Sequence, residues 1–440
     1  EQPASESNFL NVLSGWSGDA AEGNSSFVRT DKAVALPSIR PRKPVEEGIR
    51  NMKEAVQSSS LLAAMRKRLA EERIDSAPSE YVSFCKFLEE EKCDFGKLAI
   101  DEVCTVPTFR KPPTTLDKPY VVEAKSSWAP RRWTMAYWSY ECGEQACRCF
   151  PQYPPTKSCS SSSTAPHETM AAPLQARVDE FTKYVGVLRD LEASCNAATY
   201  LAYPRFFVGG WSPFAVPGSE GRTLWEEDLR ANRQLWTPNG IQDQTPRWVK
   251  LFCRSMKSDW REALASMDRI QIGPAGAISS LHVENARAHA WFGQIQGRRA
   301  FVLFPPGDSP NLSPEGISDG SEDRRDLEER TRYSALDVLR PSKAYKDFKR
   351  CHAHVAVLQP GQILVLPEGW WVYSVTLDPS VTLHRRFWNA TNKRGICEEL
   401  EAMFREQFES LPEEGGRERL KSYVDSLKYK QEQDYSSDED

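Results

Sequence analysis

From about residue 97, the sequence breaks into short apolar runs that end at proline or glycine. The clearest of these runs cover residues 120–122, 270–272, 300–304 and 362–366. Runs of this length are typical of β-strands, because helices usually need roughly ten or more residues. Many short strands separated by turns indicate a sandwich or barrel, so the sequence predicts a mainly β fold with helices.

Helical patterns precede and follow this β-rich region. Residues 1–57 are expected to form a disordered arm, because the first 45 are polar and broken by prolines. Apolar residues three and four positions apart predict a helical segment over residues 58–96. The same spacing recurs in two stretches after residue 395 and predicts a C-terminal helical hairpin with an acidic tail over residues 398–440.

Three stretches interrupt the β pattern. Residues 178–191 have helical spacing. The serine-rich stretch 151–173 and the charged stretch 318–332 have the composition of solvated loops. We therefore expect one helix and two surface insertions within this region.

Composition narrows the class of protein. The 440 residues include 57 Lys and Arg against 62 Asp and Glu, a formal net charge of −5 that does not favour a basic nucleic-acid binder. No window approaches the ~20 apolar residues of a membrane-spanning helix, and no signal peptide is visible after Glu1. Eleven cysteines fit reduced thiols, so we expect a cytoplasmic or nuclear protein.

The most informative pair of polar residues is His282 and Glu284. Residues two apart in a strand point to the same face, so an imidazole and a carboxylate would lie side by side. These are two of the three ligands in the 2-His-1-carboxylate arrangement that holds Fe(II) with open coordination positions. Taken alone, the pair is a weak signal and more often reflects a packed strand histidine beside a surface glutamate.

The surrounding motifs carry a family resemblance. After the pair come GRRAFVLFPP at residues 297–306 and PGQILVLPEGWW at residues 360–371, and stretches 117–122 and 128–134 precede it. Over residues 97–397 the sequence resembles the Jumonji C (JmjC) or cupin-8 family of Fe(II)/2-oxoglutarate oxygenases. The resemblance implies a double-stranded β-helix, or jelly roll, with helical decoration. It also implies that 117–122 and 128–134 are opening strands.

Two positions depart from the family pattern. The family places its third metal ligand after Gly-Trp-Trp, where this sequence has Val372, which has no lone pair to give. Many members carry a lysine for the far carboxylate of 2-oxoglutarate where this sequence has Arg299, which can still bind a carboxylate bidentately. The resemblance thus implies His282 and Glu284 as metal ligands, Arg299 as a 2-oxoglutarate contact, and an incomplete triad.

His384 is the other candidate in this part of the sequence. The resemblance implies an inward-facing 2-oxoglutarate contact at its position. A two-residue turn before its strand would place His384 on the opposite face from Val372, and an odd-length turn would place it on the same face. Three roles therefore stay open for His384: it could replace the lost metal ligand, line a polar pocket, or be a packed strand histidine.

Other metal-binding or aromatic residues receive no functional role. Cys351 with His352 and His354, and the group Cys142, Cys147 and Cys149, do not match the spacing of common zinc sites. The eight tryptophans between residues 128 and 260 are expected in the core and pocket lining rather than in a cage for a cationic substrate.

Two functions follow from these observations. Val372 favours a catalytically impaired or non-catalytic binding module. The alternative is an active hydroxylase or demethylase that uses Fe(II) and 2-oxoglutarate on a protein or RNA substrate. A protein partner is expected first, RNA is the alternative, and no membrane association is expected. The sequence specifies neither the substrate nor the oligomeric state.

Overall fold

The computed structural model describes residues 98, 100–152, 174–194, 205–238, 240–256, 259–312, 332–334, 336, 338–339, 341, 345–396 and 399. The chain divides into two compact units, residues 1–54 and 55–440, and all described residues belong to the second. The predicted arm 1–57, helical segment 58–96 and most of both insertions lie outside the described residues. So does the predicted hairpin over 398–440, apart from Glu399.

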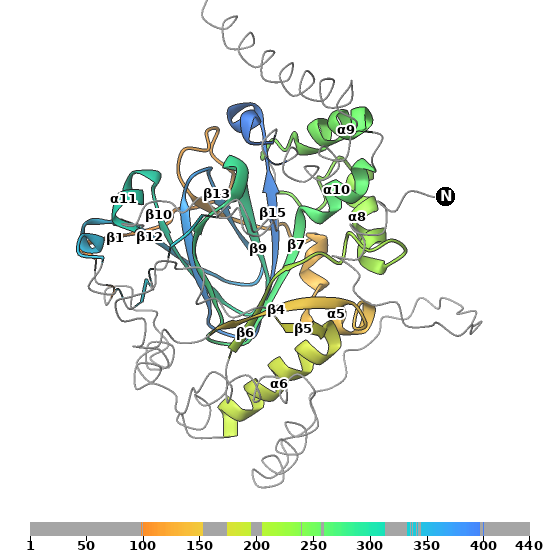
Figure 1. Ribbon diagram of the computed structural model, residues 1–440, viewed down its shortest axis with the longest axis horizontal. Helices are drawn as coiled ribbons and strands as arrows, with labels where there is room; N and C mark the ends of the chain where they lie inside the picture. The colour runs from red at the N-terminus through yellow and green to blue at the C-terminus, as the bar shows by residue number, and fades with distance from the viewer. Residues whose placement is uncertain are drawn as a thin grey trace, which may run out of the picture. The chain divides into compact units, whose positions relative to one another are not determined.

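Eight of the described strands form two facing antiparallel sheets, the jelly roll seen in Figure 1. One sheet holds, side by side, β12 (His352–Leu358), β10 (Arg299–Phe304), β14 (Trp371–Thr376) and β8 (Ile278–Val283). The other holds β13 (Gln362–Leu366), β9 (His289–Gln296), β15 (Ser380–Phe387) and β7 (Asp268–Gly273). The predicted mainly β jelly-roll fold is confirmed.

Further strands extend both sheets. β1 (Glu102–Thr105) pairs with β12 and β11 (Arg332–Tyr333) with β8, while β2 (Thr108–Phe109) and β3 (Tyr120–Glu123) lie beyond β13. On the far side of β7 lie β6 (Arg205–Trp211), β4 (Ala146–Gln152) and β5 (Leu174–Arg177). Residues 151–152 of the first predicted insertion therefore belong to β4, and residue 332 of the second belongs to β11.

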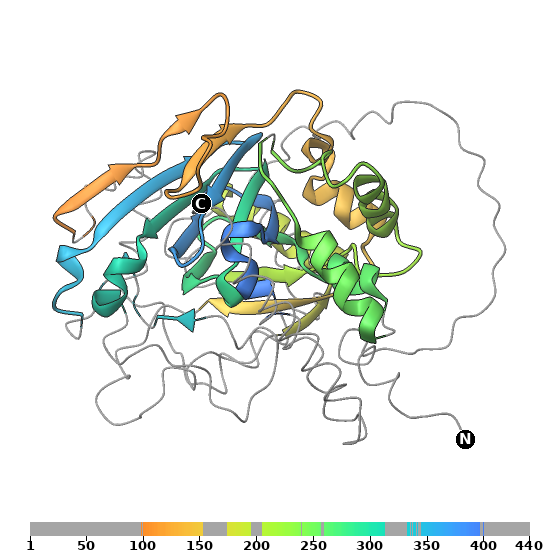
Figure 2. The same cartoon turned by 90° about the horizontal axis from the view of Figure 1, so that it is seen from above.

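The described helices α8 (Glu220–Arg230), α9 (Thr245–Met256) and α10 (Trp260–Ser266) lie beside one side of the barrel, away from β1 and β12 (Figures 1 and 2). Further described helices are α5 (Met135–Glu141), α6 (Val178–Ser194) and α11 (Ser309–Leu312), and α6 is the helix expected at 178–191. Within the part of the chain that the structure describes, no helix has the length and apolar character required to cross a bilayer.

One of the implied opening strands is wrong. Residues 129–132 form the short 3₁₀ helix η2 (Ala129–Arg132), and two residues separate it from α5. Pro130 fixes φ and removes a backbone donor in the first turn of η2, which favours a turn over a ladder strand. Thr134 then caps α5 by accepting a hydrogen bond from the backbone N–H of Tyr137.

The side chains of β10 alternate between two hydrophobic clusters. Phe301 and Leu303 pack inside the barrel with Val372, whereas Val302 and Phe304 belong to a second cluster on the other face of the sheet. Because both faces of this sheet are buried here, β10 is a continuous apolar run after Arg299. The same parity directs Arg299 into the barrel interior.

The turn between β12 and β13 requires a glycine. Gly361 has φ +91°, which L side chains rarely adopt, and Pro360 precedes it. The backbone N–H of Gln362 donates to the carbonyl of Gln359 at 2.9 Å, closing a turn of the type that places proline before glycine. The Pro-Gly pair in the sequence therefore marks the hairpin directly.

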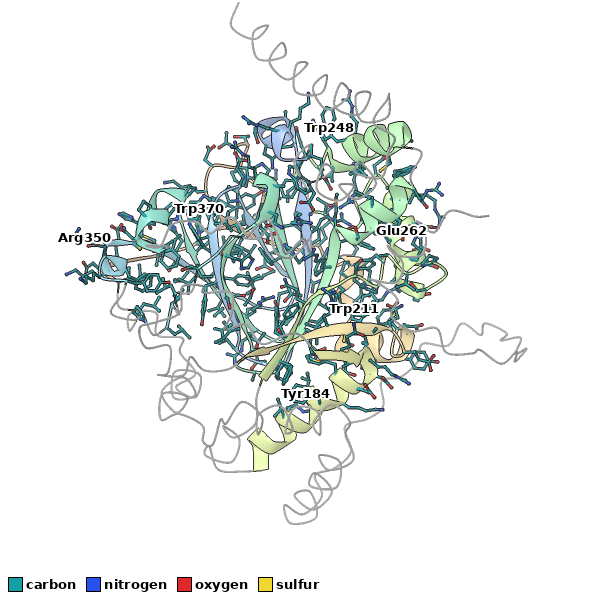
Figure 3. The ribbon with its side chains drawn as sticks, viewed as in Figure 1. Tyr184, Trp211, Trp248, Glu262, Arg350 and Trp370 are labelled. Carbon is teal, nitrogen blue, oxygen red and sulfur yellow. The ribbon has the colours of Figure 1, made fainter. Side chains whose placement is uncertain are left out.

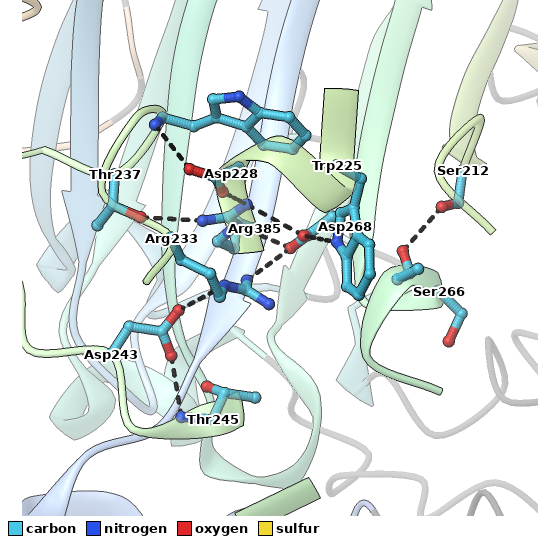
Figure 4. A network of polar contacts seen from close by, with 12 residues as sticks. Ser212, Trp225, Asp228, Arg233, Thr237, Asp243, Thr245, Ser266, Asp268 and Arg385 are labelled. Atoms are coloured by element: carbon cyan, nitrogen blue, oxygen red, sulfur yellow. Dashed lines mark hydrogen bonds and ion pairs between the residues drawn. The ribbon is translucent and has the colours of Figure 1, made fainter. Parts of the chain in front are cut away.

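A buried network of charges attaches β15 to the helical side of the barrel (Figure 4). The guanidinium of Arg385 donates from Nε to Asp268 Oδ1 and from Nη2 to Asp228 Oδ2, both at 2.8 Å. Arg233 donates from Nη2 to the same Asp268 oxygen at 2.9 Å and pairs with Asp243 at 3.1 Å. Asp268 lies on β7 and Asp228 on α8, so the network fixes the strand that also carries His384.

Candidate functional site

Three of the predicted site residues converge at one carboxylate oxygen. Nε2 of His384 lies 3.0 Å from Oε1 of Glu284, and Nε2 of His282 lies 3.8 Å from the same atom. The side chains are shielded from solvent, with 5%, 9% and 14% of their surface exposed for His384, Glu284 and His282. The structure thus brings the sequence pair together with a histidine about 100 residues further along the chain.

The connection between β14 and β15 places His384 in this cluster. Residues 377–379 join the two strands, an odd number, and the strands belong to different sheets. Val372 and His384 consequently both face the barrel interior, from opposite sides. The ring of His384 stacks on Phe292, with centroids 4.7 Å apart and planes 14° apart, and Phe292 shares the inner apolar cluster with Val372.

Backbone contacts fix His282 and Glu284. Nδ1 of His282 lies 2.7 Å from the carbonyl oxygen of Ser280, which favours the tautomer protonated at Nδ1 and leaves a lone pair on Nε2. Glu284 begins the short 3₁₀ helix η4 (Asn285–Arg287), in which Ala286 has φ +50°. Trp388 holds this strained backbone because its Nε1 donates to the carbonyl of Ala286 at 2.9 Å.

Electrostatics keep the carboxylate ionised. Burial alone would raise the pKa of Glu284, but the two neighbouring histidines offset that effect, and the pKa lies well below its usual value. Burial lowers the pKa of His384 in spite of Glu284, and Arg269 and Arg386 lower it further. Arg386, two residues after His384, donates to Glu399 Oε1 at 2.7 Å.

The donor set does not fit a three-ligand iron centre. His282 and Glu284 supply two donors with a suitable second shell. Both imidazoles approach the same oxygen of Glu284, so the carboxylate occupies the centre of the cluster. Within the described ranges, no group of three or more His, Cys, Asp or Glu side chains is arranged so that it could hold a metal ion. No reaction step through iron follows from this arrangement.

Val372 stands where the third ligand is expected. It pairs directly with His282 across β14 and β8, and only 1% of its surface is exposed. Its partners in the inner cluster are apolar residues such as Leu303, Leu364 and Trp370. The position is therefore part of the hydrophobic core.

Arg299 occupies a separate part of the interior. Nε and Nη2 donate to Ser374 Oγ at 3.1 and 2.7 Å, and Nη1 donates to Thr382 Oγ1 at 3.3 Å and to Gln271. The guanidinium also lies 5.1 and 5.2 Å from the ring centroids of Phe207 and Phe301. These described partners are all neutral, and burial lowers the pKa of Arg299 to about 9.

Such a buried cation fits an anionic ligand. Burying an unpaired charge is unfavourable, and a carboxylate beside the guanidinium would compensate it. The residues therefore fit a carboxylate group better than they fit a metal ion.

Sequence reasoning missed several members of the two sites. Arg386 and Thr382 have the same strand parity as His384, and that parity is the signal that could have identified them. Gln271 and Ser374 come from strands whose register was not predictable. Glu399 lies in a segment that was assigned to the hairpin.

The other candidates lie elsewhere. Cys147 and Cys149 are buried with their sulfurs 4.0 Å apart, and Cys142 is also a buried free thiol. Nδ1 of His352 lies 3.1 Å from Asp308 Oδ1 on the surface. Six of the eight tryptophans are core residues as expected, namely Trp128, Trp133, Trp138, Trp211, Trp225 and Trp236.

His289, at the start of β9, predicts that stability falls at acid pH. Its Nδ1 accepts a hydrogen bond from the backbone N–H of Glu368 at 2.9 Å, which requires a neutral ring. Burial lowers the pKa of His289 to about 4. Its folded-state pKa is thus below the unfolded value, so its stabilising contribution is complete above the unfolded pKa and is lost as pH falls.

Between pH ~6.5 and ~4, His289 should contribute up to ~3 kcal/mol of pH-dependent stability. The pKa values of Glu284 and His384 are also lowered by folding, so their contributions to stability are likewise lost as pH falls. A variant is therefore needed to isolate the contribution of His289. Denaturant unfolding of wild type and His289→Phe at several pH values should show a smaller pH slope for the variant. Equal slopes would contradict the assignment.

The sequence comparisons identify the class of protein. Residues 227–394 match a family model described as a cupin-like domain. Together with the relatives named below, this match shows that the chain contains a cupin-like domain of the JmjC type, as the motifs indicated.

Three relatives illustrate the range of similar proteins. HSPB1-associated protein 1 of Rattus norvegicus is 36% identical over 118 residues, covering 27% of this chain and 22% of the relative. Lysine-specific demethylase JMJ21 of Arabidopsis thaliana is 29% identical over 151 residues, covering 32% and 15%. The 2-oxoglutarate and iron-dependent oxygenase JMJD4 of Danio rerio is 23% identical over 125 residues, covering 28% and 27%. The matched part of the chain spans only about a fifth of the HSPB1-associated protein.

Proposed function

We propose that this protein is a non-catalytic JmjC-type binding module that uses its barrel to hold a small carboxylate ligand and associates with a protein partner. The observation that carries the proposal is Val372. An apolar residue buried in the core takes the place of a metal-binding imidazole, and the remaining carboxylate is engaged by His384 at 3.0 Å. These features support a retained scaffold without the family's iron chemistry.

Arg299 supports the ligand part of the proposal. Its neutral surroundings leave a buried positive charge that a carboxylate can compensate. A dicarboxylate such as 2-oxoglutarate suits this position, since one carboxylate can pair with Arg299 while the other reaches towards the histidine cluster. The relatives named HSPB1-associated protein 1 support a protein partner.

A second function is favoured by one specific observation. His384 is buried, and neither of its ring nitrogens makes a well-aligned hydrogen bond with a described residue, although Nε2 lies beside Glu284. A small movement of Glu284 would leave two imidazoles and a carboxylate available for one Fe(II). In this alternative the protein is an active 2-oxoglutarate-dependent oxygenase with His384 as its third ligand.

Ligand binding without turnover tests the proposal. 2-Oxoglutarate at about 100 times its dissociation constant should stabilise the wild-type protein by ~2.7 kcal/mol without added metal. Arg299→Gln should abolish this stabilisation, and Arg299→Lys should retain part of it. Thermal melts measure both effects, and melts without ligand show whether each variant folds.

The same samples, given Fe(II), ascorbate and oxygen, should release no succinate above a blank. Succinate release that disappears in His384→Ala would establish the second function instead. Absence of both stabilisation and succinate would contradict the proposed ligand site.

A further inference from the structure

Two tryptophans differ from the other six because they lie half-buried at the surface of α9 and α10. Trp248 has the Arg247 guanidinium 5.3 Å and the Lys393 ammonium 4.6 Å from its ring centroid. Trp260 has Lys250 at 5.4 Å and Arg261 at 5.6 Å. Each indole ring therefore makes cation–π contacts with two basic side chains.

These contacts form one continuous surface. Arg247 and Lys250 are three residues apart on α9 and share a helix face. Lys250 reaches from α9 to Trp260 on α10, and Lys393, after η8 (Ala390–Asn392), reaches Trp248. Figure 3 shows Trp248 where α9 meets this C-terminal turn. We call this region the basic surface; its exposed cations are Arg247, Lys250 and Arg261.

Two acids, Asp259 and Glu262, lie at the start of α10 beside these cations. Asp259 caps α10, and its Oδ1 accepts from the backbone N–H of Arg261 at 2.8 Å. Burial and the nearby Asp259 raise the pKa of Glu262. Arg247, Lys250 and Arg261 form no ion pair with any other residue of the described ranges. A positive surface thus exists on a chain whose net charge is −5.

We propose that the basic surface binds an acidic, extended segment of a partner protein. Arginine forks on a helix face bind carboxylates bidentately, and the half-buried indoles offer apolar area beside them. Nucleic acid fits less well, because stacking of bases requires uncovered ring faces and each ring here already carries the chain's own cations. This proposal is independent of the ligand site proposed at Arg299, which lies inside the barrel.

Binding of a defined peptide tests the proposal. A labelled peptide of repeating Asp-Ser-Glu should bind the full chain, whereas the same peptide with Asn and Gln in place of Asp and Glu should not. Fluorescence anisotropy should show that the triple variant Arg247→Gln, Lys250→Gln, Arg261→Gln binds about tenfold or more weakly. Added salt should weaken the wild-type binding, because exposed charges are screened.

A matched variant controls for net charge. Lys346→Gln, Lys349→Gln, Arg350→Gln removes three exposed cations from a distant part of the molecule, where Figure 3 shows Arg350. It should bind the acidic peptide like the wild type, and thermal melts should show that both variants fold.

Three outcomes would overturn the proposal. The first is no binding of the peptide, and the second is equal weakening by the two triple variants. The third is tighter binding of a uridine oligonucleotide, or of vesicles containing phosphatidylserine, that the first triple variant abolishes.

Discussion

Replacing Arg385 by methionine should lower the free energy of unfolding by ~3–5 kcal/mol, which is among the largest effects of a single substitution. Arg385 is fully buried between the rings of Trp236 and Trp291, with centroid distances of 5.1 and 5.4 Å. Its removal leaves the carboxylates of Asp228 and Asp268 without their main partner. Methionine retains much of the side-chain volume, so the decrease in the free energy of unfolding measures the loss of the charge and its hydrogen bonds.

Denaturant unfolding measures this effect. The control is Arg350→Met, which removes a guanidinium from an exposed ion pair with Asp347 at 3.1 Å. An exposed pair of this kind contributes only ~0–1 kcal/mol. If Arg385→Met and Arg350→Met were equally stable, the buried network would not be what fixes β15.

Val372→His should raise metal affinity by at least ~10–100-fold. Loss of an outer-shell partner typically has an effect of that size, and a first-shell ligand should matter at least as much. The new imidazole would stand directly across from His282 in the β8–β14 register. Without metal the variant should be less stable by ~1–3 kcal/mol, because a polar ring would replace valine in an apolar cluster.

Val372→Leu separates the two effects. It keeps the position apolar and adds no lone pair, so it should not change metal affinity. A thermal melt of Val372→His with and without added metal should show stabilisation by metal that Val372→Leu lacks. Stabilisation of both variants would mean that metal binds away from this position.

The sequence predicted the fold well because its strongest signals are local. Gly361 after Pro360 marks a turn, and the short apolar run at residues 300–304 marks a buried strand. The helices α8, α9 and α10 were not predicted, and α8 is fixed by buried charges, since Asp228 on α8 pairs with Arg385 and Trp225 donates to Asp268. Those charges come from segments far apart in the sequence.

The site could be predicted only in part, because its residues also come from segments far apart in the sequence. His282 and Glu284 share a face by strand parity, which local sequence reveals. The distance from His384 to Glu284 depends on a three-residue connection and on the packing of two sheets, and neither can be derived from residue types. Arg386 was missed although its parity matches that of His384, because its partner Glu399 lies beyond the β-rich region of the sequence.

The most direct test of the central claim is the iron content of the wild-type protein. After incubation with Fe(II) without oxygen and removal of free metal, mass spectrometry should find far less than one iron per chain. Val372→His, treated identically, should retain close to one. Near-stoichiometric iron in the wild type that is lost in His384→Ala would contradict the account, because His384 would then be the third ligand of a functional centre.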